Sequence, residues 1–149
     1  MNNSIVGHQV IASINDEVGG PAQSVPSLHQ ALKYNGVESI LHTMHNPRFG
    51  EMKEPFEGMI QLSRLSWLTA DWSPTFSQRL RERIEVRPGV IHNHGCWLAP
   101  NWQARKAARQ FRLPLLISPR GMLEPWSLKY RSWKKKIAWR LYEENNLNS

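Results

Sequence analysis

The sequence predicts an α/β protein with a Rossmann-like, doubly wound and mostly parallel sheet. Short apolar runs alternate along the chain with segments of helical periodicity, and glycine or polar residues typical of turns follow the apolar runs. Two apolar strands bridged by a helix form a βαβ unit, in which the strands are parallel and the crossover is right-handed. Two such units can be recognised, and we expect residues 1–149 to form one domain.

The first βαβ unit is expected near the start of the chain. Residues 9–14 (QVIASI) and 37–43 (VESILHT) predict its two strands, and the turn-forming glycines Gly19 and Gly20 follow the first strand. The helix between the strands has an apolar repeat at helical spacing. Its expected buried residues are Val25, Leu28, Ala31 and Leu32.

The start of this helix has two alternatives, because Pro26 lies inside the pattern. Either the helix starts at Pro21 and kinks at Pro26, or it starts after Ser24, which then serves as the N-cap. The pair Asn35-Gly36 is expected to end it.

The middle of the chain predicts one strand and one helix. Residues 59–62 (MIQL) are an apolar run preceded by loop-forming proline and glycine. Residues 75–85 have Phe76, Leu80 and Ile84 four apart with charged residues between them, which is typical of an amphipathic helix.

The second βαβ unit lies within residues 90–122. A strand at 90–91 ends in the polar cluster 92–95 (HNHG), a helix is expected over 99–112, and a strand at 115–117 ends in the cluster 118–121 (SPRG). Ligands of open α/β sheets bind outside the carboxyl ends of the strands. Both polar clusters are therefore expected to face one crevice.

Within the first cluster, His92 and His94 are two residues apart and should point the same way if the strand continues through them. We discount a metal site, because no third ligand lies close in sequence and Cys96 alone does not complete a tetrahedral set. For His94 we favour substrate binding or proton handling in the crevice. For His92 we favour a structural role in the loop.

Three other positions have competing interpretations. The pair Gly19 and Gly20 predicts either an anion site at a helix N-terminus or an ordinary tight turn, and we weigh the two equally. Arg120 predicts a clamp for phosphate or carboxylate, with a salt bridge to Glu124 as the alternative. Ser118 is not expected to be a hydrolase nucleophile, because no GxSxG motif surrounds it.

The composition is that of a globular chain, with 40% apolar and 21% charged residues. There is one cysteine, no pattern of a signal peptide at the N-terminus and no apolar run of about 20 residues that could span a bilayer. We therefore expect a cytoplasmic protein.

The net charge of +7 is concentrated in residues 120–140, which contain seven basic residues and one acidic residue. A helix is predicted over 128–144, with an apolar stripe and basic residues on its other faces. Its candidate contacts with an anionic membrane surface are Trp133, Lys134, Lys135 and Lys136. Nucleic-acid binding and an ordinary solvated face are the alternatives, and we do not expect nucleic acid.

Two long blocks of the sequence contain specific motifs. The first is GGPAQSVPSLHQAL at 19–32. The second is IHNHGCWLAPNWQARKAARQ at 91–110, continued by PLLISPRGMLEPWSL at 114–128 and WKKKIAWRLYE at 133–143. In these blocks the chain resembles the N-terminal half of bacterial family 4 (group 1) glycosyltransferases, which have the GT-B fold.

The resemblance implies retaining transfer of a sugar from a nucleotide sugar to a glycan acceptor, without a metal or other cofactor. It implies that this half binds the acceptor, which in many members is lipid-linked and serves lipopolysaccharide, O-antigen or capsule synthesis at the inner face of the cytoplasmic membrane. It places Gly19 and Gly20 near the donor diphosphate and His94 at the reaction centre, and it lines the same cleft with Asn93, Arg120 and Gly121.

In the family, a second Rossmann-like domain binds most of the nucleotide sugar, and no such domain follows within these 149 residues. We therefore expect a truncated or split transferase that is inactive alone, with the other half on another chain. The alternative is a non-catalytic Rossmann-like module that binds a partner chain or an anionic membrane surface.

Overall fold

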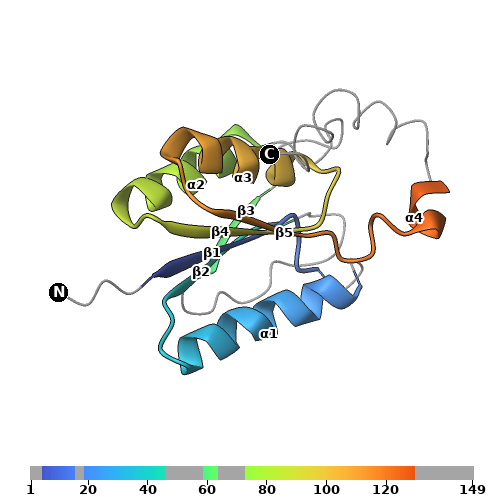
Figure 1. Ribbon diagram of the computed structural model, residues 1–149, viewed down its shortest axis with the longest axis horizontal. Helices are drawn as coiled ribbons and strands as arrows, with labels where there is room; N and C mark the ends of the chain where they lie inside the picture. The colour runs from blue at the N-terminus through green and yellow to red at the C-terminus, as the bar shows by residue number, and fades with distance from the viewer. Residues whose placement is uncertain (1–4, 16–18, 46–58, 64–72, 130–149) are drawn as a thin grey trace.

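The structure is a computed structural model that describes residues 5–15, 19–45, 59–63 and 73–129. In these ranges, five strands form one parallel sheet in the order β3-β2-β1-β4-β5 (Figure 1). The strands are β1 Val6–Ile11, β2 Ser39–His45, β3 Met59–Ser63, β4 Gly89–His94 and β5 Leu115–Ser118. The helices are α1 Gly20–Tyr34, α2 Pro74–Val86, α3 Ala99–Phe111 and α4 Pro125–Lys129.

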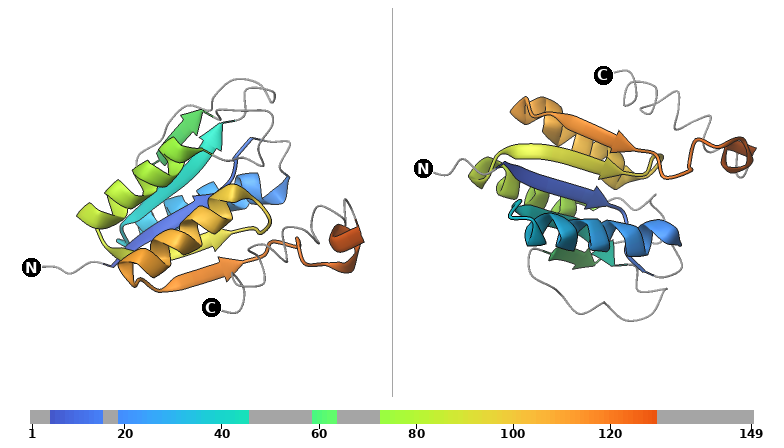
Figure 2. Two further views of the ribbon diagram at one scale, coloured as in Figure 1. Left: turned by 90° about the horizontal axis from the view of Figure 1, so that it is seen from above. Right: turned by 60° about the horizontal axis from the view of Figure 1, so that its bottom comes forward.

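The sheet is covered on both faces. Helix α1 lies against β1 and β2 on one face, and α2 and α3 lie side by side on the other (Figures 1 and 2). The predicted doubly wound α/β fold is thus confirmed. The strand order reverses between β1 and β4, and the crevice beside such a switch point is where open α/β sheets bind their ligands.

The pairing of β1 with β4 decides which residues share a face. The register sets Gln9 opposite His92 and Ile11 opposite His94. Ile11 packs with Val25 of α1, so the side chains of this parity lie on the α1 face. Both histidines therefore point to that face, as predicted from their spacing.

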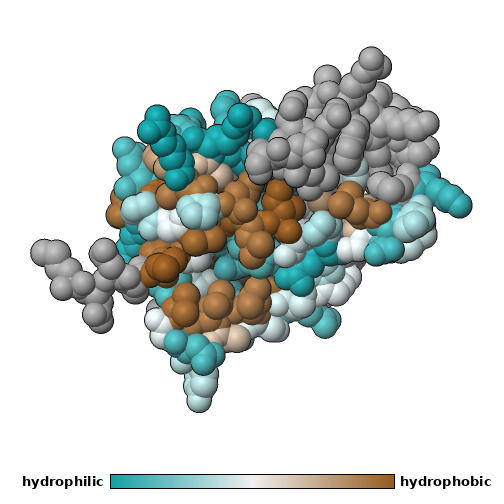
Figure 3. All heavy atoms as spheres, viewed as in Figure 1, coloured by the Kyte–Doolittle hydropathy of each residue, from teal (hydrophilic) through white to brown (hydrophobic). Residues whose placement is uncertain are grey.

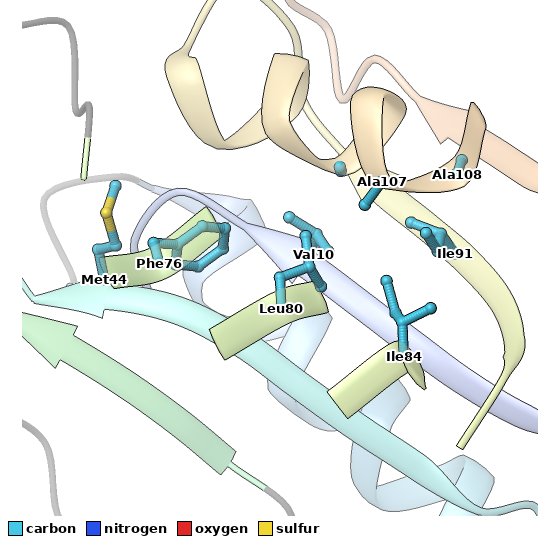
Figure 4. Close-up of a cluster of buried hydrophobic side chains, with 9 residues drawn as sticks. Val10, Met44, Phe76, Leu80, Ile84, Ile91, Ala107 and Ala108 are labelled. Atoms are coloured by element: carbon cyan, nitrogen blue, oxygen red, sulfur yellow. The ribbon is translucent and has the colours of Figure 1, made fainter. Parts of the chain in front are cut away.

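The main core lies between the sheet and the α2–α3 layer (Figure 4). Its helix side comes from the stripe of Phe76, Leu80 and Ile84, all of which are buried as predicted. Val10, Met44 and Ile91 meet them from the sheet, and the fully buried residues that α3 contributes are small: Ala104, Ala107 and Ala108. Alanines at this position let α3 lie close to the strands while the larger side chains of α2 fill the layer.

A smaller cluster lies under α1 and consists of Ile11, Ile14, Val25 and Leu41. The stripe predicted for α1 is partly wrong. The buried positions are Ala22, Val25 and His29, whereas Leu28 and Leu32 are half-buried and Ala31 is exposed. The reason is a polar contact, because His29 turns to the sheet, where its Nδ1 lies 2.9 Å from Ser39 Oγ.

Apolar surface remains on the α1 face. Figure 3 shows apolar side chains gathered over α1 and near β5. Leu116 of β5 is 53% exposed, and the register places it on the α1 face, opposite His92. Since α1 contacts β1 and β2, it leaves this part of the sheet face uncovered by a described helix.

Several predicted boundaries need correction. The first strand covers residues 6–11 rather than 9–14, and the second covers 39–45 rather than 37–43. Helix α1 begins at Gly20 and continues through Pro26, so Ser24 is not its N-cap. Pro26 is the seventh residue of α1, so the helix lacks the backbone hydrogen bond that an N–H at this position would donate to Ala22 O.

The C-terminal prediction is only partly covered by the structure. Residues 125–129 form the short helix α4, and the rest of the predicted 128–144 helix lies outside the described residues, as do Trp133, Lys134, Lys135 and Lys136. Among the helices that the structure describes, none combines the length and the apolar character that a membrane crossing requires.

The N-terminus of α2 provides a test of local stability. Ser73 is buried, and its hydroxyl accepts a hydrogen bond from Phe76 N at 3.2 Å as the N-cap. We expect Ser73→Ala to lower the free energy of unfolding by about 1 kcal/mol, measured by urea denaturation, because the backbone amide loses its partner. The matched control is Ser27→Ala, since Ser27 is exposed within α1 and its hydroxyl only bonds back to Gln23 O. An equal loss in both variants would contradict the capping role.

Candidate functional site

The candidate site lies at the carboxyl edge of the sheet. The strands β1, β4 and β5 end there, and the N-terminal end of α1 reaches the same edge (Figure 2). This brings the HNHG and SPRG clusters and the Gly19–Gly20 turn to one side of the molecule, as the sequence predicted.

The Gly19 turn requires glycine. Its φ of 83° and ψ of −152° lie in a region that L-residues with a side chain essentially do not occupy. Gly19 and Gly20 are exposed, and no atom lies within 4 Å of where a Cβ would stand at either position. No side chain among the described residues caps α1. Pro21 has no backbone N–H and Ala22 N donates to Gly19 O at 2.9 Å, so the Gly20 amide and the positive end of the helix dipole are what this end offers to an anion.

The loops after β4 and β5 are joined to each other. Gly95 N donates to Ser118 O at 2.8 Å, and Trp97 Nε1 donates to Met122 O at 3.2 Å. The Met122 side chain fills the space above Gly95, where an added Cβ would lie 3.2 Å from its methyl group. A larger residue at Gly95 would push the two loops apart.

Asn101 supports the end of β4 from the first turn of α3. Its side-chain amide donates to Asn93 Oδ1 at 2.8 Å and to His94 O at 3.2 Å, and its Oδ1 accepts from Leu98 N. Asn93 is buried, so its side chain serves this network inside the protein. The prediction that Asn93 contacts the ligand remains untested, but the geometry gives it a structural partner.

His94 is the centre of the site. It is only 2% exposed. Its Nε2 lies 2.8 Å from Gln9 Oε1 on β1, and its Nδ1 lies 2.9 Å from Arg120 Nη2 and 3.3 Å from Arg120 Nε. One imidazole thus links the ends of β1 and β4 to the loop after β5.

These contacts determine the tautomer of His94. A guanidinium has donors and no acceptor, so Nδ1 must be unprotonated and the proton of the neutral ring must be on Nε2. Burial, together with the neighbouring His92 and Arg120, lowers the pKa of His94 to about 3. The ring is therefore neutral at physiological pH, with Nε2–H donating to Gln9.

Arg120 is held in an unusual backbone conformation. Arg120 and Gly121 have φ of 54° and 77°, and Met122 N donates to Pro119 O at 3.0 Å, as in a type I′ turn. Within the part of the chain that the structure describes, no carboxylate pairs with Arg120, and the alternative of a salt bridge to Glu124 is not observed. The guanidinium instead rests against a neutral ring, so its charge is available to an anion.

His92 forms a second polar contact beside this pair. Its Nε2 lies 2.8 Å from Ser118 Oγ, and its ring centroid lies 3.9 Å from that of His94. Burial and the charge of Arg120 lower the pKa of His92 as well. The expected contact of His92 with loop backbone is replaced by this contact with a side chain. Three of the four ring nitrogens of His92 and His94 are thus engaged by other side chains.

Among the described residues, no three histidine, cysteine or acidic side chains are grouped so that they could hold a metal ion. The expectation of metal-independent chemistry remains a prediction.

The sequence did not predict two residues that contact the site, Gln9 and Asn101. A polar residue at the start of the strand predicted over 9–14 was the available signal for Gln9, but only the register shows that it meets His94.

The arrangement has two chemical capacities. An arginine without a carboxylate partner can bind a phosphate or diphosphate through two donors. A neutral imidazole next to it can accept a hydrogen bond from a hydroxyl once its Nδ1 is released. The Arg120 guanidinium and the His94 imidazole both lie at the carboxyl edge of the sheet, on the side of the molecule where α1 begins.

Comparison with known proteins agrees with this arrangement. The family model of the glycosyl transferase 4-like domain matches residues 19–148, which is most of the chain and includes both the Gly19–Gly20 turn and the site residues of β4 and β5. No curated protein and no solved structure matches the chain. The extent of the family match shows that the chain belongs to the glycosyl transferase 4-like family, as an N-terminal, Rossmann-like domain of a family 4 glycosyltransferase.

Proposed function

We propose that this domain binds the acceptor side of a sugar-transfer reaction, with His94 and Arg120 at the reaction centre. The donor is a nucleotide sugar, and the acceptor is a lipid-linked glycan of cell-surface polysaccharide synthesis. The observation that supports the proposal best is the contact between the buried, neutral His94 ring and a guanidinium that has no carboxylate partner in the described residues. The domain belongs to a glycosyltransferase family.

The chemistry of transfer needs such groups. The bond between the anomeric carbon and the diphosphate oxygen breaks, the nucleoside diphosphate leaves with the electron pair, and the acceptor oxygen bonds to the anomeric carbon. The proton of the acceptor hydroxyl passes to the departing diphosphate or to water. Negative charge develops on the diphosphate during this step, and a positioned cation stabilises it.

Arg120 suits the role of that cation. It is on a tight turn whose partner loop is pinned by Met122, so its backbone is fixed while its side chain reaches to the site. The N-terminus of α1 brings the Gly20 amide and the positive end of its helix dipole to the same edge, and these favour an anion. The two features together describe a surface for a diphosphate.

The direct test is the binding of pyrophosphate and of a nucleoside diphosphate, measured by calorimetry. We expect Arg120→Met to weaken the binding of both by about 10-fold or more, because a charge-assisted hydrogen bond contributes about 1.5–3 kcal/mol.

The matched control is Arg109→Met, since Arg109 is an exposed arginine on α3. Its removal changes the net charge equally but should leave the affinity nearly unchanged. Equal weakening in both variants would indicate general electrostatics, and unchanged binding in Arg120→Met would contradict the proposed site.

A further inference from the structure

We infer that Gln9 is a positioning residue for His94: it keeps the imidazole proton on Nε2 and thereby leaves Nδ1 as the atom that His94 offers to substrate. This inference rests on the proposed function, in which His94 stands at the reaction centre. It goes beyond that proposal, because it assigns a role to a β1 residue and assigns the reactive nitrogen.

The contact between the two side chains is direct and enclosed. Gln9 Oε1 lies 2.8 Å from His94 Nε2, although the residues are 85 positions apart in the sequence. Gln9 is 3% exposed and His94 is 2% exposed, so water does not compete for the bond. A buried hydrogen bond of this kind is costly to break.

The orientation of the Gln9 amide follows from the other side of the ring. Arg120 can only donate to Nδ1, so the proton lies on Nε2 and the amide atom that faces it must be the oxygen. The amide nitrogen of Gln9 then lies over Gly7, where an added Cβ would come within 3.2 Å of it. Gly7 therefore leaves the space in which the amide can adopt this orientation.

Arg120 and Gln9 favour the same tautomer, but they are not equivalent. Arg120 is half-buried on a loop, and under the proposed function an anionic substrate draws its guanidinium away from His94. Gln9 lies in the central strand β1, paired on both sides with β2 and β4, and cannot follow. In the substrate-bound state, Gln9 is thus the group that retains the proton on Nε2.

The contact with Gln9 determines which ring nitrogen of His94 can accept a hydrogen bond from substrate. With Nε2–H fixed to Gln9 and Arg120 engaged by the anion, the lone pair of Nδ1 becomes free. His94 then accepts a hydrogen bond from a substrate hydroxyl through Nδ1. Without Gln9, the ring could carry its proton on either nitrogen, and a fraction of the molecules would present an N–H where an acceptor is needed.

The test is the tautomer of His94, read from the imidazole ¹⁵N shifts of the 149-residue chain and assigned by the signals lost in His94→Gln. In the wild type and in Arg120→Met we expect Nε2–H. In the double variant Gln9→Met/Arg120→Met we expect a mixture of the two tautomers, since methionine keeps the length of the side chain but removes the acceptor. In Gln9→Glu/Arg120→Met a carboxylate faces Nε2, and the pKa of His94 should rise by about 1 or more relative to Arg120→Met, with His92 as the remaining titratable neighbour.

The matched control is Gln103→Met in the Arg120→Met background. Gln103 is also buried and donates to Ser73 O at 2.9 Å, away from the site. Its replacement should destabilise the fold similarly but leave the tautomer unchanged. A fixed Nε2–H in the Gln9→Met/Arg120→Met variant would overturn the inference, as would a tautomer change in the Gln103 control.

These measurements need no substrate, so they separate the inference from the proposed function. A wild-type protein that does not bind pyrophosphate, or an Arg120→Met variant that binds it unchanged, would count against the proposed function only, provided that Gln9 still determines the tautomer. A His94 tautomer that does not change when Gln9 is replaced would count against the inference, while the pyrophosphate-binding results could still hold.

Discussion

Replacing Gly89 with alanine is expected to lower the free energy of unfolding by more than about 3 kcal/mol. Gly89 begins β4 and is paired with Val6 of β1. A Cβ at this position would overlap the carbonyl oxygen of Val6 and would lie 2.8 Å from its carbonyl carbon. These are backbone atoms of the central strand pair, so relief requires β1 and β4 to separate.

Urea denaturation of Gly89→Ala measures this effect. The matched control is Gly20→Ala, because nothing lies within 4 Å of a Cβ added at Gly20. That substitution is expected to be neutral or slightly stabilising, since alanine has a higher helix propensity than glycine. A Gly89→Ala protein as stable as the wild type would show that β1 and β4 are not packed as closely as the structure has them.

The second large effect is expected in acid, where buried histidines should destabilise the fold. His8 and His42 form a buried chain in which His8 Nε2–H donates to Arg87 O at 2.8 Å and His42 Nε2 lies 3.1 Å from His8 Nδ1. Burial lowers the pKa of both, and the pKa of His42 falls to about 3 with contributions from His8 and Arg83. His94 has a similarly low pKa, again mainly through burial.

The direction of this effect follows from proton linkage. Below pH 6.5 the unfolded chain takes up protons at these histidines, whereas the folded chain does not do so until about pH 3. Stability is therefore complete above about pH 6.5 and falls as the pH decreases, by about 1.4 kcal/mol per pH unit for a histidine such as His42.

The measurement is the free energy of unfolding by urea between pH 4.5 and pH 7.5. In His42→Gln the glutamine amide can still donate to His8 Nδ1, but the titrating group is gone. Its slope against pH should decrease by the equivalent of about one proton. An unchanged slope would mean that His42 titrates normally in the folded protein.

Much of the fold was predictable from local patterns. The stripe of Phe76, Leu80 and Ile84 predicted α2 and its buried face, and short apolar runs predicted each strand to within about three residues. The α1 stripe was less accurate, since His29 takes a buried place through its contact with Ser39, and no periodicity rule assigns a histidine to the core.

The candidate site also has features that local sequence patterns predict and features that depend on tertiary contacts. The sequence by itself determined that two polar clusters follow two parallel strands, so that His92, His94 and Arg120 would lie at one edge of the sheet. This was predictable because the βαβ pattern and the turn-forming residues depend on residues that are close in sequence. It also indicated the family, through motifs within residues 19–32, 91–128 and 133–143, and the family model that matches residues 19–148 confirms it.

Only the tertiary structure decided the partners. The register of β1 against β4 brings Gln9 to His94, and the turn at Arg120 carries its guanidinium to His94 rather than to Glu124. A one-residue shift in register would move Gln9 to the other face of the sheet, so this contact depends on the packing of the whole layer. The identity of the residues at the site was therefore local information, whereas the tautomer and charge state of His94 were set by burial and by contacts between distant segments.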